Sequence, residues 1–187
     1  MPRPSTTLLL LLVLTLASPA IAGELAGVTL DDTVTDRGAT LQLVGMGLRS
    51  KLGIKAYVLG LYMERPTTDA DQVVSSRQVK RADMAVLLPL GGEIIGKFVV
   101  SGFEKTCSDT EYAALEERLD ALLTWFPTVG RGDVISMTWV PGAGTVISGQ
   151  GEVYGTVEGD DFAEALFGIW FGPSAVDDRL KSGVLGD

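Results

Sequence analysis

The sequence predicts an α+β fold, and three observations lead to that prediction. Stretches typical of strands lie toward both ends of the chain, in 28–63 and in 133–157. Between them, residues 91–126 carry apolar side chains at steps of three and four, the period of helices. The turns between the expected strands are short, which favours antiparallel pairing. Strands that are grouped apart from helices, rather than alternating with them, indicate α+β.

The first strands are expected at Val28–Leu30 and, after a polar turn region, within Leu41–Met63. The second stretch is apolar almost throughout, so two strands joined near Ser50–Gly53 should be covered on both faces. We therefore place the centre of the sheet there.

The apolar positions of this stretch change parity after Leu43. Gly45 and Gly47 stand at the change, where a β-bulge or the close approach of another backbone needs glycine. The spacing leaves two interpretations of Arg49 open: a surface charge at the end of a bulged strand, or a guanidinium aimed into a cleft.

The middle of the chain is expected to be mainly helical. Its expected elements are a short helix capped by Thr68 or Asp69 and ending near Ser76, a strand at Arg81–Leu90, a helix at Gly91–Cys107, and a helix that starts at the capping box Ser108–Glu111 and extends to Phe126.

The last third should return to strands and end in helices. Turn residues at 141–144 and 149–151 divide Asp133–Val157 into a three-stranded meander. Asp160 is expected to cap a helix that Pro173 ends, and Ser174 with Asp177 resembles a second capping box before a short terminal helix.

The chain has 187 residues, enough for one domain with a sizeable core, which we place at 23–187. Residues 1–22 have the pattern of a cleaved secretory signal peptide. Arg3 supplies the positive end, Leu8–Ala17 the apolar run and Ala20–Ala22 the cleavage site. We expect export to the periplasm or beyond. An uncleaved anchor is the alternative.

Composition narrows the possible chemistry. The formal net charge of −9 disfavours binding to nucleic acid and to membrane surfaces, and we expect no stable membrane insertion after cleavage. The chain has no histidine, which excludes histidine-activated nucleophiles and imidazole metal sites. The single cysteine, Cys107, cannot form an internal disulfide. We expect no metal and no cofactor.

The stretch GMGLRSKLGIKAYVLGLYM resembles the corresponding stretch of chalcone isomerase-like proteins, where a Gly-x-Gly-x-Arg strand precedes a strand ending in Gly-x-Tyr. Further matching segments follow in the family's order: LPLGG at 88–92, Phe126-Pro127 before Gly132-Asp133, Val140–Gly142, and IWFGP at 169–173. The likeness covers about 26–186 and is greatest to the secreted bacterial branch. It implies an open-faced β-sandwich, an antiparallel sheet with a layer of helices on one face and an apolar cleft beside it.

The resemblance also implies where a site would lie. Arg49 falls on the arginine that stabilises the developing oxyanion in the plant enzymes, which close a chalcone to a flavanone. The other polar positions of those enzymes differ here: Tyr57 replaces a threonine, Ile169 replaces a hydroxyl residue, and the helix offers Ile95, Phe98 and Gly102 in place of tyrosine, lysine and asparagine. Family members that bind fatty acids keep the arginine.

We therefore predict a non-catalytic binder of a small apolar molecule with an anionic end, fatty-acid-like or flavonoid-like. The predicted ligand-binding residues are Arg49, Tyr57 and Lys55; Lys55 is included because two-residue periodicity would place it on the face of Tyr57. Two alternatives stay open: an isomerase or intramolecular lyase that uses Arg49, and a structural or assembly partner in the cell envelope. The oligomeric state is not predicted.

Overall fold

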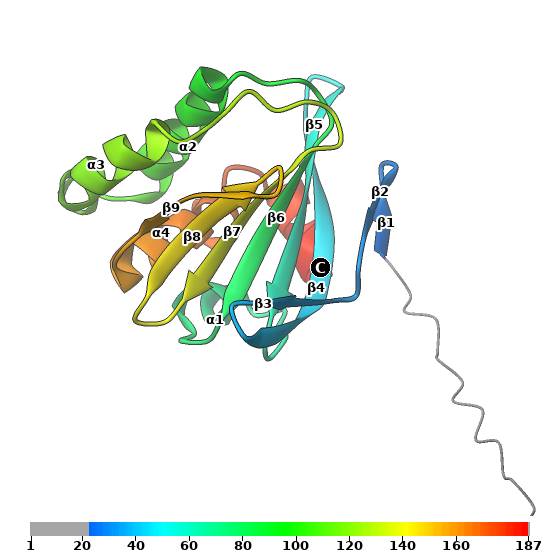
Figure 1. Cartoon of the computed structure of the whole chain (residues 1–187), viewed down its shortest axis with the longest axis horizontal. Helices are drawn as coiled ribbons and strands as arrows, with labels where there is room; N and C mark the ends of the chain where they lie inside the picture. Colours follow the sequence, from blue (N-terminus) through cyan, green and yellow to red (C-terminus); the bar gives the residue numbers. More distant parts are fainter. Residues whose placement is uncertain (1–22, 187) are drawn as a thin grey trace, which may run out of the picture.

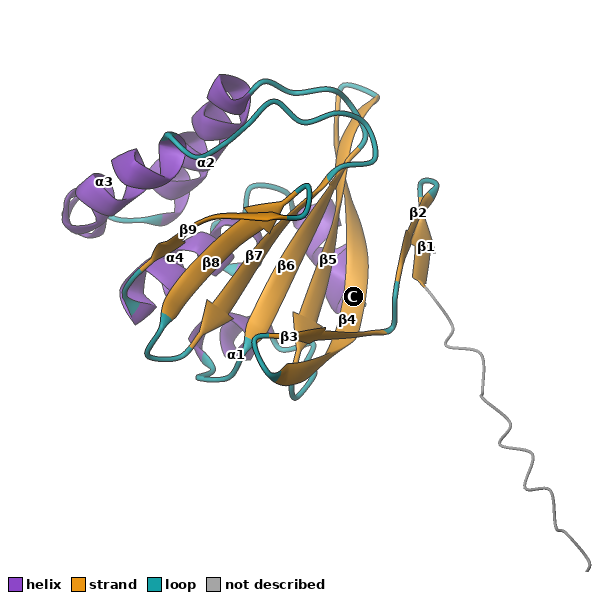
Figure 2. Cartoon of the chain, viewed as in Figure 1, coloured by secondary structure: helices purple, strands orange, loops and turns teal. Residues whose placement is uncertain are grey.

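The computed structural model describes residues 23–186, which form a seven-stranded sheet, a separate two-stranded sheet at the start of this range, and helices packed against the larger sheet (Figures 1 and 2). In chain order the elements are β1 (Gly23–Leu25), β2 (Val28–Leu30), β3 (Thr33–Asp36), β4 (Ala39–Lys51), β5 (Ile54–Met63), α1 (Ala70–Ser75), β6 (Lys80–Val86), α2 (Gly92–Thr106), α3 (Asp109–Leu123), β7 (Val134–Val140), β8 (Gly144–Gly149), β9 (Glu152–Val157), α4 (Asp160–Phe171) and α5 (Asp178–Leu185). The predicted signal peptide lies outside the described residues.

Strands β3 to β9 form a seven-stranded antiparallel sheet in which every strand pairs with its neighbours in the sequence. Helices α1, α4 and α5 lie behind the sheet in Figure 1, and α2 and α3 form a hairpin at one side. The predicted α+β class, with a layer of helices on one face, is confirmed. Among the described residues no helix has both the length and the apolar character needed to cross a membrane.

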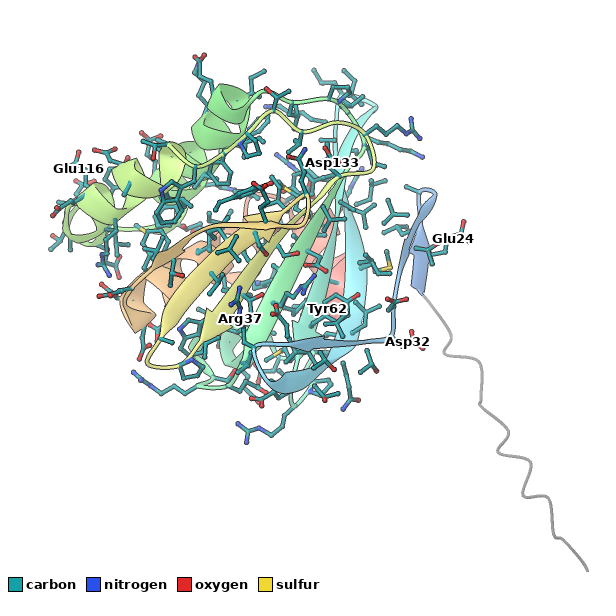
Figure 3. The ribbon with its side chains drawn as sticks, in the orientation of Figure 1. Glu24, Asp32, Arg37, Tyr62, Glu116 and Asp133 are labelled. Atoms are coloured by element: carbon teal, nitrogen blue, oxygen red, sulfur yellow. The ribbon has the colours of Figure 1, made fainter. Side chains whose placement is uncertain are left out.

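The main core fills the space between the sheet and the helices. Strand residues of one parity, such as Leu59, Met84 and Ile135, pack there against large side chains of α2 and α4, including Phe103 and Phe167. The opposite face of the sheet carries smaller apolar clusters and polar groups. Tyr62, which lies on this face in Figure 3, donates a hydrogen bond to the carbonyl oxygen of Asp31 at 2.9 Å. The sheet is thus fully covered on one side only.

Strand β4 explains the change of parity seen in its sequence. Leu43 pairs with Tyr62 and Gly45 pairs with Leu61, so Val44 is an extra residue in a β-bulge. Gly45 also lies directly under α5, because a Cβ at this position would stand 2.2 Å from the carbonyl oxygen of Val184. Both predicted reasons for glycine here, the β-bulge and the close approach of another backbone, therefore apply.

Gly47 also allows α5 to pack closely against the backbone of β4. A Cβ there would stand 2.2 Å from the carbonyl oxygen of Leu180. The two glycines form a track without side chains on which α5 lies close to the backbone of β4. This contact fixes the start of α5 near the end of β4.

The helix caps agree with the sequence in two cases and differ in two. Asp69 caps α1, and Ser108 with Glu111 forms the predicted capping box of α3. Asp160 is not a cap: Gly159 precedes α4 with a φ of 99°, and Asp160 is the first helical residue. At α5 the predicted capping box is wrong, because Asp177 is itself the cap. The Asp177 side chain also belongs to the candidate functional site described below.

Candidate functional site

A cavity of about 160 Å³ lies between the sheet, α2, α4 and the segment before α5. Most of its wall is apolar. The apolar lining consists of Ala56, Met84, Leu90, Ile95, Phe98, Val99, Gly102, Phe126, Ile135, Met137, Ile169, Trp170 and Val176. The remaining lining residues are Arg49, Lys51, Tyr57 and Ser101. The cavity is therefore apolar over most of its surface and polar near the ends of β4 and β5.

Pairing between β4 and β5 brings two predicted site residues together. Arg49 and Tyr57 are direct cross-strand partners, and both line the cavity. The next pair is Ser50 with Lys55, so Ala56 is an extra residue in a second bulge. Ala56 and Tyr57 consequently both reach the cavity although they are adjacent in sequence.

The same bulge corrects the prediction for Lys55. Regular two-residue alternation would have placed Lys55 on the face of Tyr57, but the extra residue interrupts that alternation. Lys55 is exposed and is not part of the cavity wall. Lys51, at the end of β4, is the lysine that lines the cavity.

Arg49 forms an ion pair with Asp177. Its Nη1 donates a hydrogen bond to Oδ2 of Asp177, and the two side chains are 25% and 13% exposed. The other carboxylate oxygen, Oδ1, accepts from the backbone N–H groups of Arg179 and Leu180 at 3.0 and 3.2 Å and so caps α5. Asp177 therefore links the first turn of α5 to the guanidinium.

The guanidinium is only partly used by this pair. Arginine has five N–H donors, and within residues 23–186 Arg49 makes this one hydrogen bond. The remaining donors are available to an acceptor that enters the cavity. Burial opposes the ionisation of Asp177, but the hydrogen bonds from Arg49 and from the start of α5 outweigh it and hold the pKa of this carboxyl below its usual value. Asp177 is therefore charged at neutral pH.

Tyr57 adds a neutral donor to the polar end. Its hydroxyl oxygen accepts a hydrogen bond from Nε1 of Trp170 at 2.9 Å. Burial raises the pKa of Tyr57, and the hydrogen bond from Trp170 and the charge of Arg49 offset this only in part. The phenol keeps its proton at neutral pH, and no acceptor for that proton is found within residues 23–186. It can donate to a ligand.

Sequence reasoning missed Asp177 and Trp170 as parts of the site. Asp177 resembled a helix-capping residue, which it is, and nothing local shows that its second oxygen reaches across to β4. Trp170 resembled a core residue on the apolar stripe of its helix. The described part of the chain contains no cluster of histidine, cysteine, aspartate and glutamate that could hold a metal ion.

The chain is similar to known proteins in family and in fold. A family model described as chalcone isomerase-like matches residues 22–186. No similar protein was found among the curated proteins. Among solved structures, the chain is similar to a fatty-acid binding protein from Arabidopsis thaliana, with a TM-score of 0.66 and 17% sequence identity over 85% of this chain and 92% of that chain. At this identity the likeness concerns the fold.

Proposed function

This chain belongs to the chalcone isomerase-like family, and from that premise we propose that it is an exported, non-catalytic binder of a small apolar molecule with an anionic end. Fatty-acid-like and flavonoid-like molecules have this chemistry. The observation that carries the proposal is the guanidinium of Arg49, partly unused, at one end of an otherwise apolar cavity. The fatty-acid binding protein of similar fold is consistent with it.

The proposed binding mode follows from the polar groups. The apolar part of the ligand lies against α2 and α4, which removes its surface from water. Its carboxylate or phenolate accepts hydrogen bonds from the N–H groups of Arg49 that Asp177 does not use, and from the hydroxyl of Tyr57. Guanidinium and carboxylate match in shape and charge, so this end of the ligand sets its orientation.

The size of the cavity limits what is enclosed. A volume of about 160 Å³ is below the 300–1,000 Å³ that is usual for ligand pockets. A ring or a short chain segment fits inside, whereas a longer tail must extend past Phe98, which lines the cavity and is 59% exposed. We therefore use dodecanoic acid, a tail of moderate length, as the probe.

Removal of the guanidinium tests the proposal. Arg49→Ala should weaken the binding of dodecanoic acid about ten- to a hundredfold, because a charge-assisted hydrogen bond contributes roughly 1.5–3 kcal/mol. Arg49→Lys should restore only part of the affinity, since lysine keeps the charge and loses the planar fork. Isothermal titration calorimetry measures both.

Two controls make this test specific. The methyl ester should bind the wild type and Arg49→Ala about equally, because it lacks the anionic end. Arg77→Ala removes another arginine–aspartate pair, with Asp160, in which the arginine side chain is 68% exposed and lies outside the cavity wall; this variant should bind like the wild type. Equal affinity of wild type and Arg49→Ala for the free acid would contradict the proposal.

The non-catalytic part of the proposal rests on the same contacts. A chalcone cyclase needs an oxyanion stabiliser and groups that orient and deprotonate the phenol. Here the raised pKa of Tyr57 keeps it from acting as a base near pH 7. Naringenin chalcone should therefore cyclise at its spontaneous rate in stopped-flow absorbance. An acceleration of about 10³-fold, the scale of one preorganised donor, would favour the lyase alternative.

Export is supported by the leader pattern of residues 1–22. The intact mass of the protein recovered from the periplasm or the medium should correspond to a chain that begins at Gly23. A product that retains Leu8–Ala17 would indicate a membrane anchor.

A further inference from the structure

The hairpin of β4 and β5 extends beyond the rest of the sheet. The last pair between β5 and β6 is Tyr57 with Val86, whereas β4 and β5 continue to pair with each other through Ser50–Lys55 and Lys51–Ile54. We call residues 50–55 the finger. In Figure 1 it projects at the end of the molecule where the connections to α2 and from α3 also lie.

The tip of the finger exposes large apolar side chains. Leu52 is 94% exposed and Ile54 is 58% exposed, and Lys51 and Lys55 are their immediate neighbours in sequence. Neither lysine forms an ion pair within residues 23–186. The finger is thus apolar at its tip and positive at its flanks.

The other hairpins of the chain show that the turn itself does not require leucine. Each of the four two-residue turns in the described chain has a non-glycine residue and then a glycine at positive φ: Ala26-Gly27, Arg37-Gly38, Leu52-Gly53 and Gln150-Gly151. Asparagine or aspartate is the usual first residue of such turns. A large apolar residue is present only in the finger, where water surrounds it.

Charge is segregated in the same region. The chain has 24 acidic residues and a net charge of −9, yet none of its acidic residues lies between Asp36 and Glu64. Of the cations within this segment, Arg37 and Arg49 pair with Asp36 and Asp177, whereas Lys51 and Lys55 form no ion pair within residues 23–186. The net charge of the chain repels an anionic surface, but the finger itself would attract such a surface.

The finger is also next to the cavity. Lys51 belongs to both, and Ala56, the residue after the finger, lines the cavity wall. Phe98 also lines the cavity and is 59% exposed. A surface that holds the finger would therefore lie close to the side on which the cavity is reached.

We propose that the finger docks on an anionic phospholipid bilayer, with Leu52 and Ile54 at the boundary of the acyl chains and Lys51 and Lys55 at the level of the phosphates. Apolar side chains beside lysines are the chemistry that binds such an interface. Two exposed apolar residues are too few for a stable protein interface, which buries about 800 Å² on each partner. Docking would load or release the ligand of the proposed binding function directly at the membrane.

Vesicle flotation tests the proposal with the exported product purified from cells. The wild type should float with vesicles of equal parts phosphatidylcholine and phosphatidylglycerol at low salt. It should float far less with phosphatidylcholine alone, because each lysine near an anionic surface contributes favourably. Leu52→Asn should reduce partitioning about tenfold, since it removes most of the apolar surface of the tip. This variant should fold, because asparagine before glycine suits the turn.

A matched control separates the finger from exposed leucine in general. Gln150→Leu, introduced together with Leu52→Asn, places a leucine in the same turn type beside Glu152. It should not restore flotation. Lys55→Gln, which lies outside the cavity, should weaken flotation about fivefold. All variants share one N-terminus, so a contribution from residues 1–22 cannot produce these differences.

Each outcome decides the proposal. Equal flotation of wild type and Leu52→Asn, recovery through Gln150→Leu, or no flotation of the wild type would overturn it. A concentration-dependent dimer that Leu52→Asn abolishes, without vesicle binding, would assign the finger to a second copy of this chain and also overturn it. Leu52→Asn should bind dodecanoic acid in solution like the wild type, so a failure of membrane docking is distinguishable from a failure of the proposed binding function.

Discussion

Lys80 and Arg49 are both enclosed on the helix-covered side of the sheet, in different ways. Lys80 is 0% exposed, and its Nζ donates to the carbonyl oxygens of Val73 and Val74, both at 2.6 Å, at the end of α1. The ammonium also lies 4.7 Å from the ring centre of Trp139 and 4.9 Å from that of Phe167. Arg49 has one partner, Asp177, and lines a cavity.

The difference separates a side chain that is part of the core from a cation that is available to a ligand. The contacts of Lys80 come from main-chain carbonyls and aromatic faces, which enclose it and leave no path for another molecule. The contact of Arg49 comes from one carboxylate, and its other guanidinium N–H groups have no hydrogen-bond partner within residues 23–186. Removal of Lys80 should therefore affect stability, and changes around Arg49 should affect binding.

The largest expected effect is on stability. Lys80→Ala should lower the free energy of unfolding by about 3–4 kcal/mol, because it leaves two helix carbonyls without a donor and opens a cavity in the core. Urea denaturation measures this. Lys80→Met fills most of the space and should cost less, about 1–3 kcal/mol for the unpaired carbonyls. A loss below 1 kcal/mol in Lys80→Ala would mean that the enclosure is not stabilising.

The second effect is a pH dependence. Burial lowers the pKa of Lys80 to about 8 from an ordinary value of 10.5, and the charge of Glu164 offsets part of the shift. Between these two values the unfolded chain binds more protons than the folded chain, so the free energy of unfolding should rise with pH. The rise should reach up to about 3 kcal/mol. Lys80→Met is the reference, and an equal pH profile in both proteins would contradict the expectation.

The smallest effect concerns the partner of Arg49. Asp177→Asn keeps a side-chain oxygen that can cap α5 and removes the negative charge beside the guanidinium. Dodecanoic acid should then bind about tenfold more tightly, because the charge of Asp177 no longer repels its carboxylate, while dodecanol should change little. Calorimetry decides between this result and weaker binding of the acid, which would show that the role of Asp177 in holding Arg49 in position outweighs its repulsion of the ligand.

Much of the fold could be predicted because its signals are local. The meander, the capping box of Ser108 and the bulge at the glycines of β4 are each visible within a few residues of sequence. The errors at α4 and α5 concern which of several neighbouring polar residues forms the cap. That choice depends on main-chain angles, such as the positive φ of Gly159, that short patterns do not specify.

The site could be predicted only in part. The resemblance pointed to Arg49 and Tyr57, and both line the cavity. Lys55 was misplaced because the bulge at Ala56 depends on how two strands pair, which alternation along one strand does not show. Asp177 lies 128 positions from Arg49, so their pairing is a property of the tertiary structure alone.

The track of Gly45 and Gly47 has a consequence for mutational surveys of this protein. Neither residue lines the cavity, yet a methyl group on either would collide with the backbone of α5 and push that helix away. Asp177 sits at the head of the helix and would move with it, which would leave Arg49 unpaired. In a library of variants selected for ligand binding, substitutions of these two glycines would therefore reduce binding as strongly as substitutions of cavity residues. A binding site mapped from such data would wrongly include the contact between β4 and α5.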